Sequence, residues 1–373
     1  MTAPDDWRRA FALREAGVYY ALALLMAVVA IAAAAHGLPA YLSAGNLTNI
    51  AYQASLVGIM GVAMTIVLIT GAFDLSVASV AALAAAVLIG LAPAIGFPLA
   101  LCAALTTGAA VGLVNGAIVN LIGINAFIVT LGTLTAVRGL VLVLTDGRSL
   151  MVEDPQLLAR MLAFEGARLP AFWPLLGIAL VLLAWGARRA WRRRRFGLVA
   201  GGVVLAAAAL AAGPGLTIPA TVGYLIGITT IAAFVLSYTV VGRRLYATGG
   251  NAEAARLAGI ETTAYKIGAF TLSGLAAGFA GALFASRLGA INPTALQGAE
   301  LTVIAAAILG GTSLFGGAGS VVKTVVGALI LFTLTNGFNV LNLGANYQGL
   351  IEGLVVIGAA AIYTVGSRRG ARA

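Results

Sequence analysis

The sequence is poor in charged residues and contains almost no histidine or cysteine. Only 9% of its 373 residues are charged, against roughly 25% in a typical soluble domain. One histidine, His36, and one cysteine, Cys102, cannot form a His/Cys metal cluster, a Cys–His nucleophile pair or an internal disulfide. Charges are also too sparse in the apolar runs for a pair of catalytic carboxylates. We therefore expect no metal site and no covalent chemistry, and we expect Cys102 to be a small buried apolar residue.

Apolar residues are correspondingly abundant. They make up 61% of the chain, and the mean hydropathy is +1.04. A water-soluble core of this size cannot hide so much apolar surface, whereas lipid can solvate it, provided that every backbone group is hydrogen-bonded internally. The apolar runs are too long for barrel strands, which need about 9–11 residues to cross a membrane. The composition therefore predicts an all-α, polytopic transmembrane bundle in a single permease domain, residues 1–373.

About twelve hydrophobic segments follow one another along the chain, some of them broken or half helices. The segment at 300–311 is short for a full span and is expected to be a half-helix. The segments lie at 18–35, 50–70, 75–92, 97–121, 124–144, 171–187, 196–212, 219–241, 264–290, 300–311, 320–341 and 346–366. An even number of crossings places both termini on the same side of the membrane.

Basic residues cluster between these segments, and their positions predict the orientation. Six arginines lie within 188–195, and others lie in the polar tail 1–16 and near the C-terminus. Because lysine and arginine near span ends mark the cytoplasmic side, both termini, 188–195 and 242–263 are expected to be cytoplasmic, and 145–170 to lie outside. The net charge of +10 therefore indicates membrane topology and not nucleic-acid binding. We interpret the first apolar run, which ends in AAAA, as an uncleaved helix and not as a signal peptide.

Two apolar runs are interrupted by glycines and polar residues. One interruption reads TGAFDLS at 70–76, and the other reads GGTSLFGGAG at 310–319. Broken helices in two halves of a chain are typical of a translocation site, although tight loops between helices explain them equally well. Asp74 in the first interruption could cap the next helix, because an unpaired carboxylate is expensive in lipid.

Residues 317–324 read GAGSVVKT, which is one residue away from a phosphate-binding loop. Val322 stands where that loop needs a glycine, so the backbone could not wrap a phosphate in the usual way. The segment also lies between two apolar runs. We therefore expect nucleotide hydrolysis, if any drives this protein, to occur on another polypeptide.

The loop at 242–260 is the largest predicted cytoplasmic loop between spans. Asn251 is a good helix N-cap, Glu253 suits a first helical turn, and Gly259 can end the helix. These residues predict a short helix that lies across the membrane surface. Both an ordinary connector and a docking element for a partner fit that helix.

Four segments resemble one family, the permeases of bacterial ABC importers of the ribose/xylose class. The coupling loop of that family is similar to GRRLYATGGNAEAARLAGI at 242–260. Three further matches follow the family order: TGAFDLSVASVAAL at 70–83, NAFIVTLGTLTAVRGL at 125–140 and AELTVIAAAILGGTSLFGGAGSV at 299–321. The extra helix pair in 145–218 is most like the longer, xylose-type permeases. The sequence departs from the family pattern at Ala78 and at Asn125–Ala126. It therefore predicts the cargo less specifically than it predicts the family.

The resemblance implies a transporter subunit of the bacterial inner membrane that is not itself an enzyme. It implies a second copy of the permease, two ATPase subunits or one fused tandem ATPase, and a periplasmic sugar-binding protein. No cofactor is expected in this chain, because ATP and Mg would bind to the ATPase. The implied cargo is a monosaccharide, with a pentose such as xylose favoured. The residues implied in ATPase coupling are Arg243, Arg244, Asn251, Glu253, Ala254, Ala255, Arg256 and Gly259.

Residues that could line a sugar pathway are a separate hypothesis. A sugar needs hydroxyl and amide neighbours, although serine and threonine in membrane helices often bond only their own backbone. Arg138 is expected to pair with a carbonyl or a carboxylate, with Glu300 and Glu352 as unranked candidates, or to extend to the outer face. Alternatives to a sugar importer are an importer of branched-chain amino acids or nucleosides, and an ion-coupled secondary transporter. The pathway candidates are Asp74, Ser76, Asn115, Thr130, Thr133, Arg138, Thr312 and Ser313.

Overall fold

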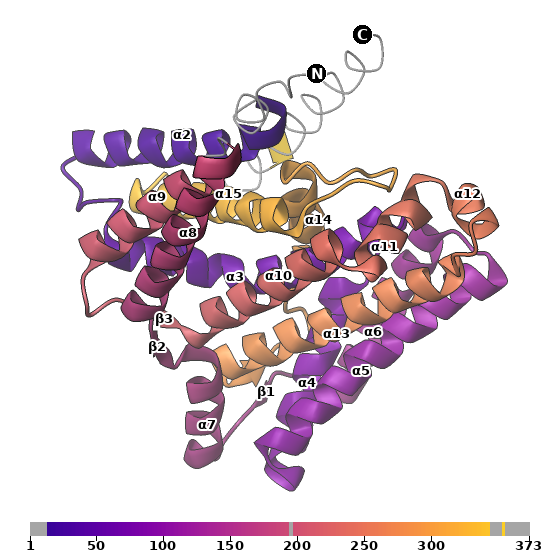
Figure 1. Ribbon diagram of the computed structural model, residues 1–373. Coiled ribbons are helices and arrows are strands. Elements are labelled where there is room, and N and C mark those ends of the chain that lie inside the picture. The colour runs from indigo at the N-terminus through magenta and orange to yellow at the C-terminus, as the bar shows by residue number, and fades with distance from the viewer. Residues whose placement is uncertain (1–12, 194–196, 344–352, 355–373) are drawn as a thin grey trace.

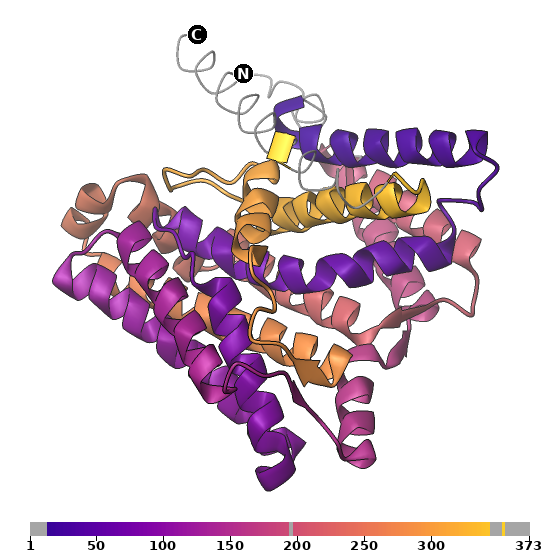
Figure 2. The same cartoon turned by 180° about the vertical axis from the view of Figure 1, so that it is seen from behind.

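A computed structural model describes residues 13–193, 197–343 and 353–354 (Figure 1 and Figure 2). Long helices dominate it, as the composition predicts. The first half contains α2 (Leu13–Ala35), α3 (Ala44–Ile69), α4 (Val77–Ile95), α5 (Phe97–Ala117), the π-helix η1 (Ile118–Ile122), α6 (Ala126–Leu144), α7 (Pro155–Gly166) and α8 (Phe172–Arg193). The second half contains α9 (Gly197–Ala212), α10 (Ala220–Tyr238), α11 (Val240–Gly250), α12 (Ala252–Leu257), α13 (Thr262–Leu288), α14 (Ala299–Leu309) and α15 (Val321–Val340).

Eleven of the twelve predicted hydrophobic segments coincide with helices, and the twelfth, 346–366, lies almost entirely outside the described residues. Among the described residues, eight helices are long and apolar enough to cross a membrane. The segment predicted as a half-helix forms α14, whose 11 residues span only about 16 Å at 1.5 Å per residue. The polytopic helical bundle is confirmed. The even number of crossings stays a prediction, because α14 is too short to cross a membrane by itself.

Two short antiparallel strand pairs, which were not predicted, join connections between helices. In the first, β1 (Leu150–Met151) pairs with β4 (Ala290–Ile291), with Leu150 opposite Ile291. In the second, β2 (Arg168–Pro170) pairs with β3 (Thr217–Pro219), with Leu169 opposite Ile218. These pairs fix the loops around α7 to the end of α13 and to the start of α10.

The centre of the bundle is formed by α3, α4 and α13. Every residue from Ala54 to Ile69 of α3 is buried, and so is every residue from Val77 to Ala86 of α4. Small side chains fill much of this core, so the helices approach one another closely. The helix α13 packs against α3, α4 and α5.

The packing of α5 on α13 depends on glycines spaced four residues apart. A Cβ atom on Gly112 would lie 2.2 Å from the carbonyl oxygen of Phe270, and one on Gly274 would lie 2.1 Å from that of Gly108. The glycine stripe is therefore the face through which α5 packs on α13. The expectation that Cys102 is buried is wrong, since Cys102 is exposed. The reason is that α5 packs mainly through its glycine face and turns other faces outward.

The two long central helices connect opposite ends of the bundle. A 26-residue helix such as α3 is about 39 Å long, more than the roughly 30 Å of a bilayer's hydrocarbon core. At one end lie α11 and α12, and at the other lies α7, with α13 running between them (Figure 1). The two ends can therefore lie on opposite sides of a membrane.

Candidate functional site

Four of the predicted pathway residues form one buried polar network. Asp74 accepts hydrogen bonds from the backbone N–H and the hydroxyl of Ser76, at 3.0 and 2.6 Å. The Ser76 hydroxyl accepts one from the Asn115 amide at 3.0 Å, and the Asn115 oxygen accepts one from the Thr133 hydroxyl at 2.6 Å. The other oxygen of Asp74 accepts a bond from Ser273 on α13 at 2.7 Å. One network therefore joins the break after α3 to α5, α6 and α13.

This network is closed to solvent over most of its length. Asp74, Ser76 and Asn115 are each at most 1% exposed, and only Thr133 is half-buried. Buried polar groups need such partners, because each unsatisfied group costs about 1–3 kcal/mol. The predicted capping role of Asp74 is not found: the N-cap of α4 is Ser76, and Asp74 binds only the Ser76 amide, which precedes the first residue of α4. Contact with a sugar remains a prediction for these residues.

Thr130 and Arg138 lie on α6 but do not join the network through any hydrogen bond among the described residues. The Thr130 hydroxyl donates to the Ala126 carbonyl of its own helix at 2.8 Å. The Arg138 guanidinium donates to the carbonyls of Pro293 and Ala295, at 3.1 and 2.7 Å. The expected carbonyl partner of Arg138 is therefore found in the connection between β4 and α14. Of the two glutamates considered, Glu352 lies outside the described residues.

The second break, 310–320, contains the other two pathway candidates. Thr312 is 2% exposed, and its hydroxyl has no hydrogen-bond partner among the described residues. Ser313 closes a loop, with its N–H donating to the Ala318 carbonyl at 2.9 Å. The segment that resembled a phosphate loop leads directly into α15, whose N-cap is Ser320. It therefore comprises the end of the connection from α14 and the first turn of α15.

The segment α11–α12 has the local structure that its sequence predicts. The Asn251 side chain accepts hydrogen bonds from the N–H groups of Glu253 and Ala254, at 3.1 and 2.9 Å, and thereby caps α12. Glu253 lies in the first turn, where a negative charge favours the helix. Gly259 has a φ of 79° and follows the end of the helix, as a C-terminal glycine commonly does.

The outward face of α12 differs from the predicted set of coupling residues in two places. Among the predicted residues, Ala255 is buried at 4% exposure and packs inward. Leu257, which the sequence analysis did not single out, is 86% exposed. An exposed leucine beside small residues is the kind of projection that fits a partner's groove. The other predicted coupling residues are exposed: Arg243, Arg244, Asn251, Glu253, Ala254, Arg256 and Gly259.

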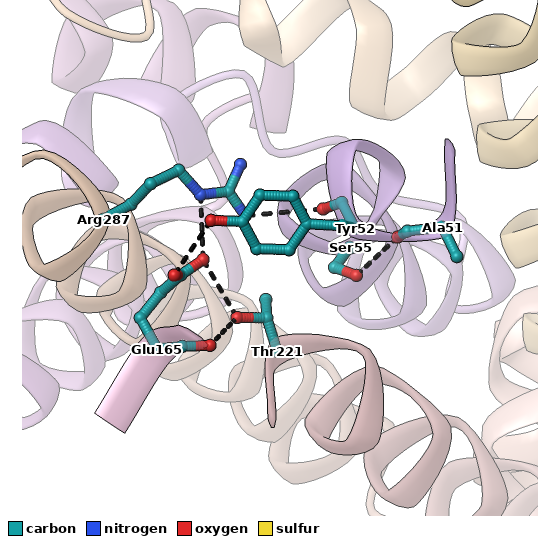
Figure 3. A network of polar contacts seen from close by, with 6 residues as sticks. All are labelled: Ala51, Tyr52, Ser55, Glu165, Thr221 and Arg287. Carbon is teal, nitrogen blue, oxygen red and sulfur yellow. Dashed lines mark hydrogen bonds and ion pairs between the residues drawn. The ribbon is translucent and has the colours of Figure 1, made fainter. Parts of the chain in front are cut away.

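A second buried cluster lies at the other end of the bundle, and the sequence analysis missed it (Figure 3). Its centre is Glu165, which lies in the last turn of α7 and is 2% exposed. The Glu165 carboxylate accepts hydrogen bonds from Arg287 at 2.8 Å, Tyr52 at 2.9 Å and Thr221 at 3.0 Å. The Arg287 guanidinium also lies 3.8 Å from the centre of the Tyr52 ring. These residues tie α3, α7, α10 and α13 together, and an arginine near the end of an apolar run was the available signal.

A cavity of about 620 Å³ lies beside this cluster. It shares Tyr52 with the cluster, and its other polar groups come from the start of α3 and from the β2–β3 pair. Its volume falls within the roughly 300–1,000 Å³ of small-molecule sites. The polar residues that line it are Thr48, Asn49, Tyr52, Arg168 and Thr217.

Known proteins similar to this chain are membrane permeases. A family model described as "Branched-chain amino acid transport system / permease component" matches residues 46–360. Ribose import permease protein RbsC of Escherichia coli (strain K12) is 36% identical over 349 residues, covering 92% of each chain. Xylose transport system permease protein XylH of the same strain is 36% identical over 335 residues, covering 85% of this chain and 84% of that protein. The Bacillus subtilis (strain 168) RbsC is 32% identical over 351 residues, covering 92% and 91%. No solved structure matches the chain.

Proposed function

Because this chain belongs to the family of permease components of ABC importers, we propose that it carries a monosaccharide, with a pentose favoured, across the bacterial inner membrane. The chain is a transporter subunit and not an enzyme. Relatives named for ribose and for xylose are equally similar at 36% identity, which supports a pentose without choosing between the two. The proposed energy source is ATP, hydrolysed with Mg on a separate ATPase chain.

The single observation that carries the docking proposal is the exposed face of α12. Glu253, Arg256 and Leu257 all project from a capped helix that protrudes at one end of the bundle (Figure 1). An apolar side chain beside charged ones can enter a groove and fix the orientation there. We propose that this face of α12 binds the ATPase, and that Ala255 instead anchors α12 to its own chain.

The orientation follows from the same end of the molecule. Arg243, Arg244 and Arg256 are exposed there, and positive charge favours the cytoplasmic side. We propose that α11–α12 and both termini are cytoplasmic, and that the end with α7 and the cavity faces the periplasm. A periplasmic binding protein would then release its sugar close to that cavity, whose hydroxyl and amide groups suit a polyol. Two copies of the permease and two ATPase domains complete the proposed importer.

The experiment that tests docking compares two charge reversals. Glu253→Arg places a positive charge on the outward face of α12, whereas Glu261→Arg makes the same change beyond that helix, where the Glu261 side chain forms no capping bond. We expect Glu253→Arg to abolish co-purification of the ATPase and Glu261→Arg to retain it. Normal assembly and normal uptake in the Glu253→Arg protein would contradict the docking role.

A different cargo is the second candidate, because the matching family model is described by branched-chain amino acids. The affinities of the partner binding protein for pentoses, hexoses and amino acids decide between the two cargoes. An ion-coupled mechanism has less support, since the buried carboxylate of Asp74 is already engaged by three hydrogen bonds from serines.

A further inference from the structure

Both helix breaks meet each other beside α11. The Ile69 carbonyl, at the end of α3, accepts a hydrogen bond of 2.9 Å from the N–H of Gly317 in the second break. Tyr246 of α11 donates its hydroxyl hydrogen bond to the Gly319 carbonyl at 2.8 Å. Burial raises the pKa of Tyr246, so its phenol remains a protonated donor at neutral pH. The end of α11 is therefore hydrogen-bonded to the second break, and the second break is hydrogen-bonded to the first.

Glycines allow these three segments to touch through their backbones. A Cβ atom on Gly249 of α11 would lie 1.7 Å from the Ile69 carbonyl oxygen and 2.8 Å from the Gly317 nitrogen. A Cβ on Gly316 would lie 2.6 Å from the Gly249 oxygen and 2.9 Å from the Cα of Gly71. No side chain fits between these backbones. We call the set Gly71, Gly249, Gly316 and Gly317 the glycine junction.

Direct backbone contact determines what happens when α11 moves. A side chain at an interface can change rotamer and absorb a small shift, whereas closely packed backbones have no such freedom. The junction is also close to the docking helix, because Gly250 ends α11 and Asn251 caps α12. A displacement of α12 must therefore reach the junction with little loss.

Beyond the junction lies the polar network described above. The first break begins at Thr70, contacts the junction at Gly71, and contains Asp74 and Ser76, which bond to α13 and α5. Two buried hydroxyls near the junction, those of Thr248 and Thr312, have no hydrogen-bond partner among the described residues. An arrangement that leaves such groups unpaired is disfavoured relative to one that pairs them. One of these hydroxyls lies on α11 and the other in the second break, so both belong to segments that meet at the junction.

We propose that the glycine junction couples the docking helix to both helix breaks, with Gly249 as its positioning residue and Tyr246 as its hydrogen-bonded link. A shift of α12 displaces α11, and α11 displaces the segments 70–76 and 310–320 together. This inference rests on the proposed docking of an ATPase at α12. It assigns to Gly249 a role in transport that does not involve contact with the ATPase or with the sugar.

The test uses two neighbouring glycines that differ in the space around them. Gly249→Ala forces a clash with backbone atoms, whereas a Cβ on Gly250 would have no neighbour closer than the Cα of Gly317 at 3.9 Å. Each variant is purified as the complete complex with its ATPase, reconstituted in liposomes, and supplied with binding protein and labelled ribose or xylose. Three quantities are measured: ATPase retained, ATP hydrolysed and sugar taken up.

We expect Gly250→Ala to match the wild-type complex in all three quantities. Gly249→Ala is expected to retain the ATPase and its hydrolysis, while sugar taken up per ATP falls about tenfold, within the range typical of coupling between sites. Tyr246→Phe removes one hydroxyl and no packing, and is expected to lower the same ratio by a smaller factor. If the Gly249→Ala complex does not assemble, the Tyr246→Phe variant tests the proposed coupling in its place.

Wild-type uptake per ATP in an assembled Gly249→Ala complex would overturn the inference, as would an unchanged ratio in Tyr246→Phe. A failure of the proposed docking is distinguishable, because it appears as normal assembly of the Glu253→Arg protein. Equal loss of the ratio in Gly250→Ala would also overturn the inference, since it would show sensitivity to any added methyl group and not to the junction.

Discussion

The Glu165–Arg287 pair offers the sharpest test of how the end of the bundle opposite α11–α12 is held together. Replacing Arg287 by methionine keeps an unbranched apolar stem but removes the guanidinium that donates to Glu165 at 2.8 Å. The Glu165 side chain is only 3% exposed, so its charge would remain buried with Tyr52 and Thr221 as its remaining donors. Breaking a buried pair in this way costs about 3–5 kcal/mol. Because the Arg287 side chain is 17% exposed, we expect about 3 kcal/mol, at the low end of that range.

The assay is reversible unfolding in mixed micelles, followed by circular dichroism. Arg148→Met is the matched control, because Arg148 pairs with Asp146 at 3.6 Å while both side chains are more than 80% exposed. Such surface pairs contribute little, so no measurable change is expected there. The double variant Arg287→Met/Glu165→Gln removes both charges. Its loss of unfolding free energy should be smaller than the sum of the two single-variant losses by about 1–3 kcal/mol. Additive single losses, or equal effects at Arg287 and Arg148, would refute the idea of a desolvated ion pair.

Two further predictions concern the centre of the bundle. Gly112→Ala is expected to lower the free energy of unfolding by about 1–3 kcal/mol, because it overpacks the core. The control Gly132→Ala should have no such effect, because nothing lies within 4 Å of a Cβ atom at that position. Equal melting temperatures of the two variants would contradict the close packing of α5 on α13. Thr133→Val removes the hydroxyl that binds Asn115 and should destabilise by about 1 kcal/mol, while Thr130→Val, whose hydroxyl bonds only its own helix, should be close to neutral in the same melting assay.

Features that depend on local sequence were predicted well. The positions of the apolar helices and the cap at Asn251 each follow from a few neighbouring residues. The short α14 was also predicted, because an apolar run of that length cannot cross a bilayer. In each case the physical cause acts within one helix or one turn.

Features that depend on distant parts of the chain were not predicted. Glu165 and Arg287 are 122 residues apart, and neither position stands out without knowledge of how α7 meets α13. The strand pairs β1–β4 and β2–β3 are too short to leave an alternating pattern. The exposure of Cys102 depends on which face of α5 is packed, and the residues next to Cys102 in the sequence do not specify that face. The burial of Ala255 has the same explanation on α12.

We propose that this chain moves sugar only when a separate ATPase drives it. The most direct measurement is uptake of labelled ribose and xylose into proteoliposomes that contain the purified permease, with its ATPase and its binding protein each present or omitted. We predict that sugar is taken up only when both partners are present and ATP is supplied on the side of the membrane to which α12 is exposed. Sugar uptake by the permease alone, driven by a proton or sodium gradient, would contradict the account.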